Sequence, residues 1–225
     1  MTRNMTLAAV LAMLPLTTAC GQNPSEPTEA ALSELEAKAA AMEESAANVE
    51  APAETVTAMT SAEAGRTAPE VTALDAYGDP ISFDALSGTS GTILVFTRSA
   101  EWCPYCQEQL IQLESVKDAL ASEGWNLAAI SYDAPEIITA FAAKHDITYP
   151  LLSDTDSETI KRWGLLNTEM PEGTRYYGIP HPTIAYIGMD GTLLRIDTNT
   201  DYKVRPSPQD VIDAALSTSM DGDGQ

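Results

Sequence analysis

Cys103 and Cys106 are the residues of this chain best suited to chemistry, because they lie three positions apart at the expected start of a helix. The apolar run 92–97 predicts a buried strand, and the residues after it favour a helix that begins at or near Cys103. A thiol at a helix N-terminus lies among unpaired N–H groups and the positive end of the helix dipole. Both stabilise the thiolate, so we expect the pKa of Cys103 to fall from about 8.5 towards the range of about 3.5–7.5 found in reactive cysteines. A second thiol one turn along can capture the first as a disulfide, which predicts redox chemistry.

The two cysteines are expected to have different roles. Cys103 comes first and should be the more exposed, which makes it the nucleophile, and Cys106 should be the buried thiol that resolves it. Two structural alternatives are a buried unreactive pair and half of a four-cysteine zinc site. Zinc would need a second pair, and the chain has only three cysteines. We expect no metal and no other cofactor.

The third cysteine, Cys20, closes a segment with the features of an export signal. Residues 1–20 combine a basic start, a short apolar stretch at 7–16 and small residues before the cysteine. The apolar stretch is too short to span a bilayer. The segment resembles the lipobox of bacterial lipoproteins, which implies a lipid anchor on Cys20 and a periplasmic location. Gly21 favours the outer membrane, and ordinary secretion is the alternative.

The charge of the chain argues against one class of partner. The sequence has 33 acidic and 12 basic residues, for a net charge of −21, so nucleic acid is not expected to bind. Residues 21–66 are rich in Ala and Glu and contain no aromatic residue, which predicts a disordered or helical tether. Within it, a heptad stripe at 32–49 could be a short oligomerising helix or a transient one, so the oligomeric state is open. Residues 219–225 should form a disordered tail.

Residues 67–218 have the alternating pattern of one folded domain. Apolar runs predict strands at 71–74, 81–83, 92–97, 125–132 and 149–152 and a hairpin of 183–187 with 193–196. Helical spacing predicts helices after the cysteines, at 135–144 with Asp133 as N-cap, at 157–163, and from Pro208 onward. Strands alternating with helices indicate a mixed sheet covered on both faces.

This order of elements resembles the thioredoxin superfamily. Trp102 and Cys103 are similar to the motif of thioredoxin, and Pro104 and Tyr105 to that of glutaredoxin. The two leading strands and the long span that follows Cys106 resemble the redoxin branch, which includes the alkyl hydroperoxide reductase/thiol-specific antioxidant proteins. The resemblance implies an α/β thioredoxin-like fold, with a central mixed sheet flanked by helices.

The segment His181-Pro182-Thr183 is the second landmark of this resemblance. In thioredoxin-like proteins a cis proline followed by threonine lies beside the cysteines, which implies that Pro182 is cis and that a substrate segment pairs there. Pro180 is the rival for this role. The resemblance also makes His181 either a cation that lowers the thiol pKa or an ordinary residue before proline. The expected wall of the site comprises Trp102, Pro104, Tyr105, His181, Pro182 and Thr183.

The chain departs from both family patterns at the positions before Cys103. Thioredoxin has a buried aspartate where this chain has Thr97, so proton transfer must use water, Glu101 or another group; a solvated charge is the alternative for Glu101. Peroxiredoxins have a proline and a threonine or serine where this chain has Phe96 and Ala100. Their late-strand arginine is also missing here, with His181 closest.

Three functions are consistent with these residues. We rank first a thiol–disulfide oxidoreductase that acts on protein or small-molecule disulfides and is recharged by an unidentified redox partner. A peroxiredoxin-like thiol peroxidase ranks second, because the residues that polarise a peroxide are missing. A copper-binding module that uses Cys103, Cys106 and His181 ranks third.

Overall fold

The computed structural model describes residues 64–222, and within them eight strands form one sheet. The predictions for residues 1–20, for Cys20, for the heptad stripe and for nearly all of the tether lie outside these residues. The strand order across the sheet is β1-β8-β7-β4-β5-β6-β2-β3. The expected thioredoxin-like fold, with a mixed sheet flanked by helices, is confirmed.

The central strands make this sheet mixed. The bounds of the strands are β1 Arg66–Thr67, β2 Ala73–Leu74, β3 Pro80–Ile81, β4 Gly91–Phe96, β5 Trp125–Ser131, β6 Leu151–Ser153, β7 Thr183–Gly188 and β8 Thr192–Thr198. β4 and β6 pair parallel to β5, and β7 pairs antiparallel to β4 and β8. The parallel pairs are joined through helices, as right-handed crossover units require.

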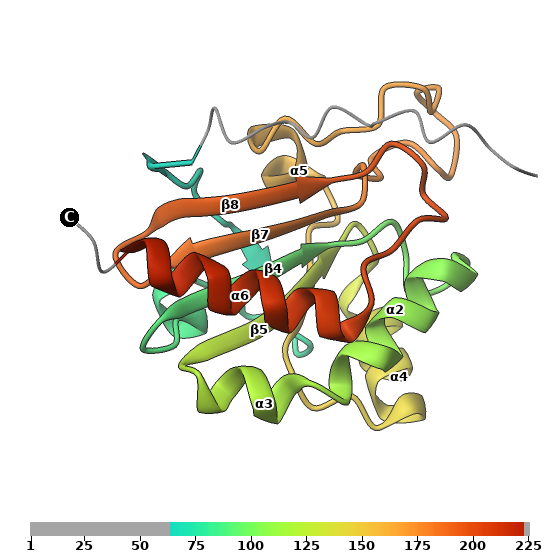
Figure 1. Ribbon diagram of the computed structural model, residues 1–225. Helices are drawn as coiled ribbons and strands as arrows, with labels where there is room; N and C mark the ends of the chain where they lie inside the picture. Colours follow the sequence, from blue (N-terminus) through green and yellow to red (C-terminus); the bar gives the residue numbers. More distant parts are fainter. Residues whose placement is uncertain (1–63, 223–225) are drawn as a thin grey trace, which may run out of the picture. The chain divides into compact units, whose positions relative to one another are not determined.

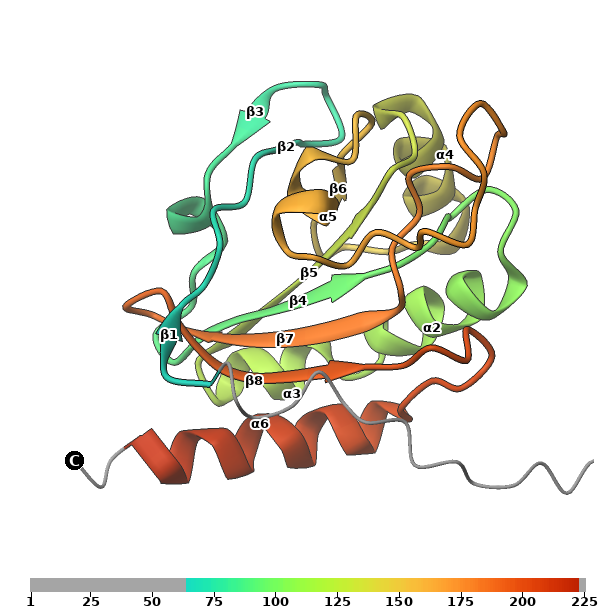
Figure 2. The ribbon, with the colours of Figure 1, turned by 90° about the horizontal axis from the view of Figure 1, so that it is seen from above.

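Every residue of β4 is buried, which explains its uninterrupted apolar sequence. Ile93 and Val95 pack on one face of the sheet against α2, α3, α4 and α6. Leu94 and Phe96 pack on the other face, together with side chains from α5 and the leading strands. Figures 1 and 2 show α6 and α3 lying along the first of these faces.

The helices begin largely where the sequence predicts them. Their bounds are η1 Phe83–Leu86, α2 Pro104–Glu114, α3 Lys117–Ser122, α4 Pro135–His145, α5 Glu158–Arg162 and α6 Pro208–Gly222. The single helix expected after the cysteines is two helices, because the chain breaks at Ser115 and Val116. α6 continues to Gly222, into the segment assigned to the tail. None of the described helices combines the length and the apolar character needed to cross a bilayer.

The register of the sheet brings four chain segments to one edge. Phe96, the last residue of β4, pairs with Thr183, the first of β7, and Thr183 pairs in turn with Thr198, the last of β8. β5 runs parallel to β4 and ends at the same edge. The segments after β4, β5 and β8 and before β7 therefore meet there, which is the place that open α/β sheets use for their sites.

Candidate active site

Cys103 and Cys106 form a disulfide at the start of α2, with their Cα atoms 5.2 Å apart. Cys103 is the N-cap, its sulfur accepts a hydrogen bond from the Cys106 N–H at 3.3 Å, and Pro104 follows as the first helical residue. A proline is tolerated there because its missing N–H would have no helical partner. The expected position of the pair at a helix N-terminus is confirmed.

Both cysteines are buried in the folded domain. Cys103 is 2% exposed and Cys106 is fully buried. Cys103 is thus the more exposed of the two and Cys106 is buried, as predicted. The difference is small, because neighbouring side chains cover both sulfurs in this oxidised state. A substrate reaches the sulfurs only when part of that cover moves.

The loop between β4 and α2 is held in place by Asp133, which follows β5. The Asp133 carboxylate accepts hydrogen bonds from the Ser99 hydroxyl at 2.7 Å, the Ala100 N–H at 2.6 Å and the Ser131 hydroxyl at 2.9 Å. Burial raises the pKa of Asp133 despite these donors. The expected role of Asp133 as N-cap of α4 is wrong, since Ala134 takes that position without a side-chain bond. Asp133 instead fixes the chain that leads to Cys103.

Trp102 forms the aromatic side of the site. Its indole N–H donates to the Tyr132 hydroxyl at 2.9 Å, and its ring lies edge-on to Tyr176 with the centroids 4.8 Å apart. The expected role of Trp102 beside the cysteines as a wall residue is consistent with this position. Glu101 is exposed and lies 3.8 Å from the guanidinium of Arg175, so it faces a surface cation.

Two arginines from different elements lie in this region, one against Cys106 and the other against Trp102. The Arg205 guanidinium lies 3.5 Å from the Cys106 sulfur, from the segment between β8 and α6. Arg98 follows β4, is buried, and stacks on Trp102 at 5.2 Å and on Tyr202 at 4.2 Å from the ring centroids. Burial lowers the pKa of Arg98. Burial and the charge of Arg98 lower the pKa of Arg205 to about 10, which still leaves it charged at neutral pH.

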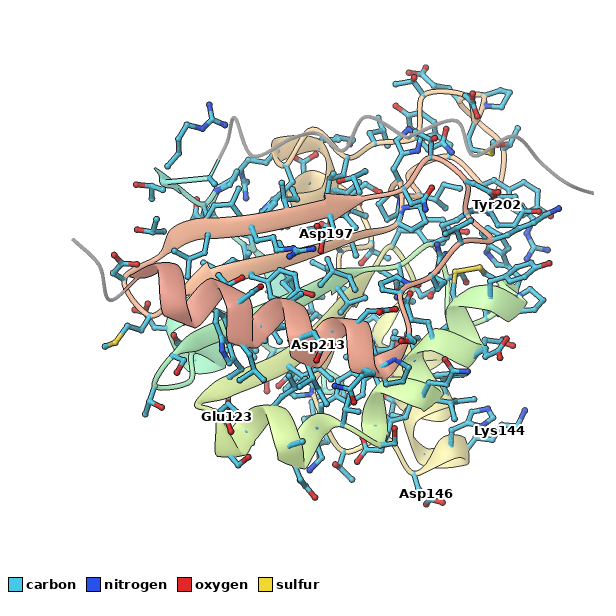
Figure 3. The ribbon with its side chains drawn as sticks, in the orientation of Figure 1. Glu123, Lys144, Asp146, Asp197, Tyr202 and Asp213 are labelled. Atoms are coloured by element: carbon cyan, nitrogen blue, oxygen red, sulfur yellow. A yellow bond between two sulfur atoms is a disulfide. The ribbon has the colours of Figure 1, made fainter. Side chains whose placement is uncertain are left out.

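The segment that carries Arg205 also covers the start of α2. The ring of Tyr202 lies 5.8 Å from that of Tyr105, the residue before Cys106, and both rings are 39% exposed. Figure 3 shows the yellow bond of the disulfide below the label of Tyr202. Residues 199–207, which we call the cover loop, thus lie against the cysteines.

The predicted cis proline is absent. The described residues contain no cis peptide bond, so the bond before Pro182 is trans. The His181 N–H donates to the Leu165 carbonyl at 2.7 Å, and Pro180 bridges to Leu166, which holds this segment extended. An X-Pro bond prefers trans unless the fold enforces cis, and this pairing does not.

Pro182 and Thr183 lie beside the same cavity as Arg205, the residue that contacts Cys106. They line a cavity of about 400 Å³ together with Arg205 and with Gln109, which is one turn beyond Cys106. The segment therefore shares a cavity with Arg205, which contacts Cys106. Its direct contact with the cysteines stays a prediction, and its cis geometry is not found. The Thr183 hydroxyl lies 3.1 Å from the His181 carbonyl oxygen.

His181 does not join the cysteines in a metal site. Within residues 64–222, no three His, Cys, Asp or Glu side chains converge to hold a metal ion. The His181 imidazole Nδ1 is buried without a hydrogen-bond partner. The set of ligands that a copper module would need is not assembled in the described part of the chain.

Sequence reasoning missed Arg205, Asp133 and Tyr202. Each comes from a segment far from the cysteines, so spacing along the chain gives no hint of the contact. The signal available for Arg205 was weak: few cations occur in a strongly acidic chain, and this one follows the last strand. Only the pairing of β7 with β4 and β8 brings it to Cys106.

Comparisons with known proteins agree with this architecture. The model of the AhpC/TSA family matches residues 64–196. Peroxiredoxin Bcp of Escherichia coli strain K12 is 29% identical over 135 residues, which cover 60% of this chain and 85% of that protein. Among solved structures, peroxidoxin BcpB of Mycobacterium tuberculosis has a TM-score of 0.59 at 22% identity and covers 71% of this chain and 97% of its own. AhpC of Enterococcus faecalis has a TM-score of 0.61 at 14% identity and covers 72% and 95%.

Proposed function

The chain belongs to the AhpC/TSA family, and we propose that within it this oxidoreductase is a thiol peroxidase that acts through Cys103 and Cys106. The Cys103 thiolate attacks one oxygen of a hydroperoxide and the O–O bond breaks. The alkoxide or hydroxide that leaves takes a proton from solvent and becomes an alcohol or water. Cys103 becomes a sulfenic acid. The Cys106 thiolate then attacks that sulfur, the S–O bond breaks, and the disulfide forms. The hydroxide that leaves takes a proton from solvent and becomes water. A thiol reductant reopens it.

The observation that carries this proposal is the Cys103–Cys106 disulfide at the first turn of α2. The resolving sulfur is already within bonding reach of the reacting one, so resolution does not require the helix to unwind. The relatives named as peroxiredoxins support peroxide as the oxidant, which the sequence ranked second.

Arginine side chains can supply the polarising group that the residues before Cys103 lack. A peroxide needs a positive or hydrogen-bonding group to stabilise the charge that develops as its O–O bond breaks. Arg205 lies against Cys106 and Arg98 against Trp102, the residue before Cys103, and Ala100 leaves the usual hydroxyl position empty. Ser99 carries the nearest hydroxyl in the sequence, but it donates to Asp133. We therefore propose a peroxidase with a modest rate.

The missing hydroxyl favours a second candidate, thiol–disulfide exchange as the main activity. In that case Cys103 attacks a substrate disulfide and Cys106 resolves the mixed disulfide. The same cysteines serve both reactions, and only the oxidant differs.

Stopped-flow measurement of peroxide consumption tests the proposal. The reduced enzyme should consume hydroperoxide much faster than a free thiol does, and Cys103→Ser should abolish this. Cys106→Ser should allow one turnover and leave a sulfenic acid on Cys103 that a dimedone probe captures. Consumption at the free-thiol rate together with rapid reduction of insulin disulfides would instead identify the second candidate.

We also propose that the enzyme works in the periplasm, anchored by lipid on Cys20 and recharged there by a redox partner. The export pattern of residues 1–20 supports this location.

A further inference from the structure

Arg205 makes a contact whose chemistry depends on the redox state of the cysteines. Its Nη2 lies 3.5 Å from the sulfur of Cys106, a residue 99 positions away in the chain. A neutral disulfide sulfur is a weak acceptor, whereas a thiolate is a strong one. The contact is therefore weak in the oxidised state and becomes a charge-assisted hydrogen bond when Cys106 is a thiolate.

The charges around the disulfide are unbalanced in the oxidised state. Neither Arg205 nor Arg98 forms an ion pair with a carboxylate in residues 64–222, and the Nε atoms of both are buried without a partner. Asp201 is the acid that acts on Arg205 from the cover loop, and it is exposed. The first turn of α2 contains no acid, and Glu101 faces Arg175. Of the acids that line the cavity beside Arg205, Asp197 is paired with Arg195 and Asp210 with Ser207. Arg205 thus faces the Cys106 sulfur without an ion pair, and reduction creates an anion beside it.

Cys106 needs such a partner to react. It is fully buried, and burial alone raises the pKa of a thiol and makes it a poor leaving group. Cys103 has the helix N-terminus to stabilise its charge, whereas the N–H of Cys106 is already bonded to Cys103. A cation at 3.5 Å is the remaining means of holding charge on the second sulfur.

We propose that Arg205 is a catalytic residue that holds Cys106 as a thiolate whenever the disulfide opens. A reductant thiolate attacks the Cys103 sulfur, a new S–S bond forms there, and the Cys103–Cys106 bond breaks. Its electron pair remains on Cys106, where Arg205 stabilises it, and no proton is needed in this step. The inference rests on the proposed function only in that the disulfide must open and close during turnover.

Two consequences follow from stabilising the reduced state. The couple becomes more oxidising, since whatever stabilises the thiolate form raises the reduction potential. Cys106 also remains a thiolate at neutral pH, ready to attack the sulfenic acid on Cys103. Arg205 therefore assists both the opening and the closing of the disulfide.

Titration of Cys106 tests the proposal without any substrate. In a Cys103→Ser background, the ultraviolet absorbance of the Cys106 thiolate is followed against pH, with the double cysteine-to-serine variant as blank. Adding Arg205→Met should raise the pKa by about one unit, a tenfold loss of thiolate, because a hydrogen bond to a charged group is worth about 1.5 kcal/mol. Arg205→Lys should recover part of the shift, since it keeps the charge. The Arg205→Lys variant also serves as the test if the Arg205→Met variant does not fold.

Arg195→Met is the matched control. Arg195 lines the same cavity but is paired with Asp197 at 2.8 Å, so its removal should leave the titration unchanged. An unchanged Cys106 pKa in both Arg205 variants would overturn the proposal, and so would an equal shift in the Arg195 variant.

The reduction potential gives a second, independent measurement in protein with both cysteines. Equilibration with glutathione should show the Arg205→Met couple about tenfold harder to reduce, or about 30 mV more negative. An unchanged potential contradicts the proposal. Neither measurement involves peroxide, so a protein without peroxidase activity can still confirm the role of Arg205, and an active peroxidase can still refute it.

Discussion

Replacing Tyr202 with alanine should loosen the cover loop and expose the disulfide. The Tyr202 ring lies 4.2 Å from the guanidinium carbon of Arg98 and 5.8 Å from the ring of Tyr105. A cation–π contact at a partly exposed site is worth about 0.5–1 kcal/mol, and an aromatic pair about 0.5–1.5 kcal/mol. Together they stabilise the closed loop by about 1.5 kcal/mol.

This energy sets how often the loop opens. Since about 1.4 kcal/mol corresponds to a factor of ten in an equilibrium constant, Tyr202→Ala should raise the open population about tenfold. Both sulfurs are buried when the loop is closed, so reduction by a bulky thiol must proceed through the open population, in which the Tyr202 end of the loop has moved away and Arg205 stays at Cys106. The rate of reduction by excess glutathione should therefore also rise about tenfold, measured by quenching with an alkylating agent and mass spectrometry.

Tyr77→Ala provides the control, because Tyr77 is 89% exposed and its hydrogen bond to Asp75 uses the backbone N–H. Its rate of reduction should match that of the wild type. An unchanged or slower rate in Tyr202→Ala would refute the idea that this loop limits access. A changed reduction potential in the same variant would show instead that the substitution acts through Arg205.

Three further predictions concern the support of the site and the location of the protein. Burial raises the pKa of Asp133 above its ordinary 3.8, so the folded state keeps a proton that the unfolded chain releases. As pH rises from about 4 through that raised pKa, the free energy of unfolding of the wild type should therefore fall relative to that of Asp133→Asn. Urea unfolding at a series of pH values checks this. Gly91→Ala should destabilise the domain by about 3 kcal/mol in thermal unfolding, because φ at Gly91 is +144° and a Cβ would collide with the Ile187 carbonyl oxygen of β7. Gly173→Ala is the control, since a Cβ there meets no atom and should lower the free energy of unfolding less. Cys20→Ser should move the protein from the membrane to the soluble fraction of the cell envelope, and an unchanged distribution would contradict the lipid anchor.

The parts of the fold that local pattern determines were predictable. The apolar run of β4 required a strand buried on both faces, and the pair of cysteines with Pro104 required a helix start, so the position of the disulfide followed from sequence. The break after Glu114 was not visible, because the residues on either side keep helical spacing.

The rest of the site depends on contacts between distant segments. Arg205 reaches Cys106 only because β8 ends at the edge where β4 ends, and no spacing rule encodes that pairing. Asp133 had the features of a helix cap, but the donors of Ser99 and Ala100 compete for its carboxylate. The expectation that the bond before Pro182 is cis came from family resemblance, whereas the backbone pairing of His181 holds this bond trans.

The disulfide joins residues only three apart, so it shortens the unfolded chain very little. In the chain-entropy description such a small ring contributes about 2 kcal/mol, whereas a ring of 100 residues contributes about 4.7 kcal/mol. The large apolar layers on both faces of the sheet do not pass through this bond. The domain can therefore lose and regain its cross-link many times without melting, as a component that is oxidised and reduced in every working cycle must.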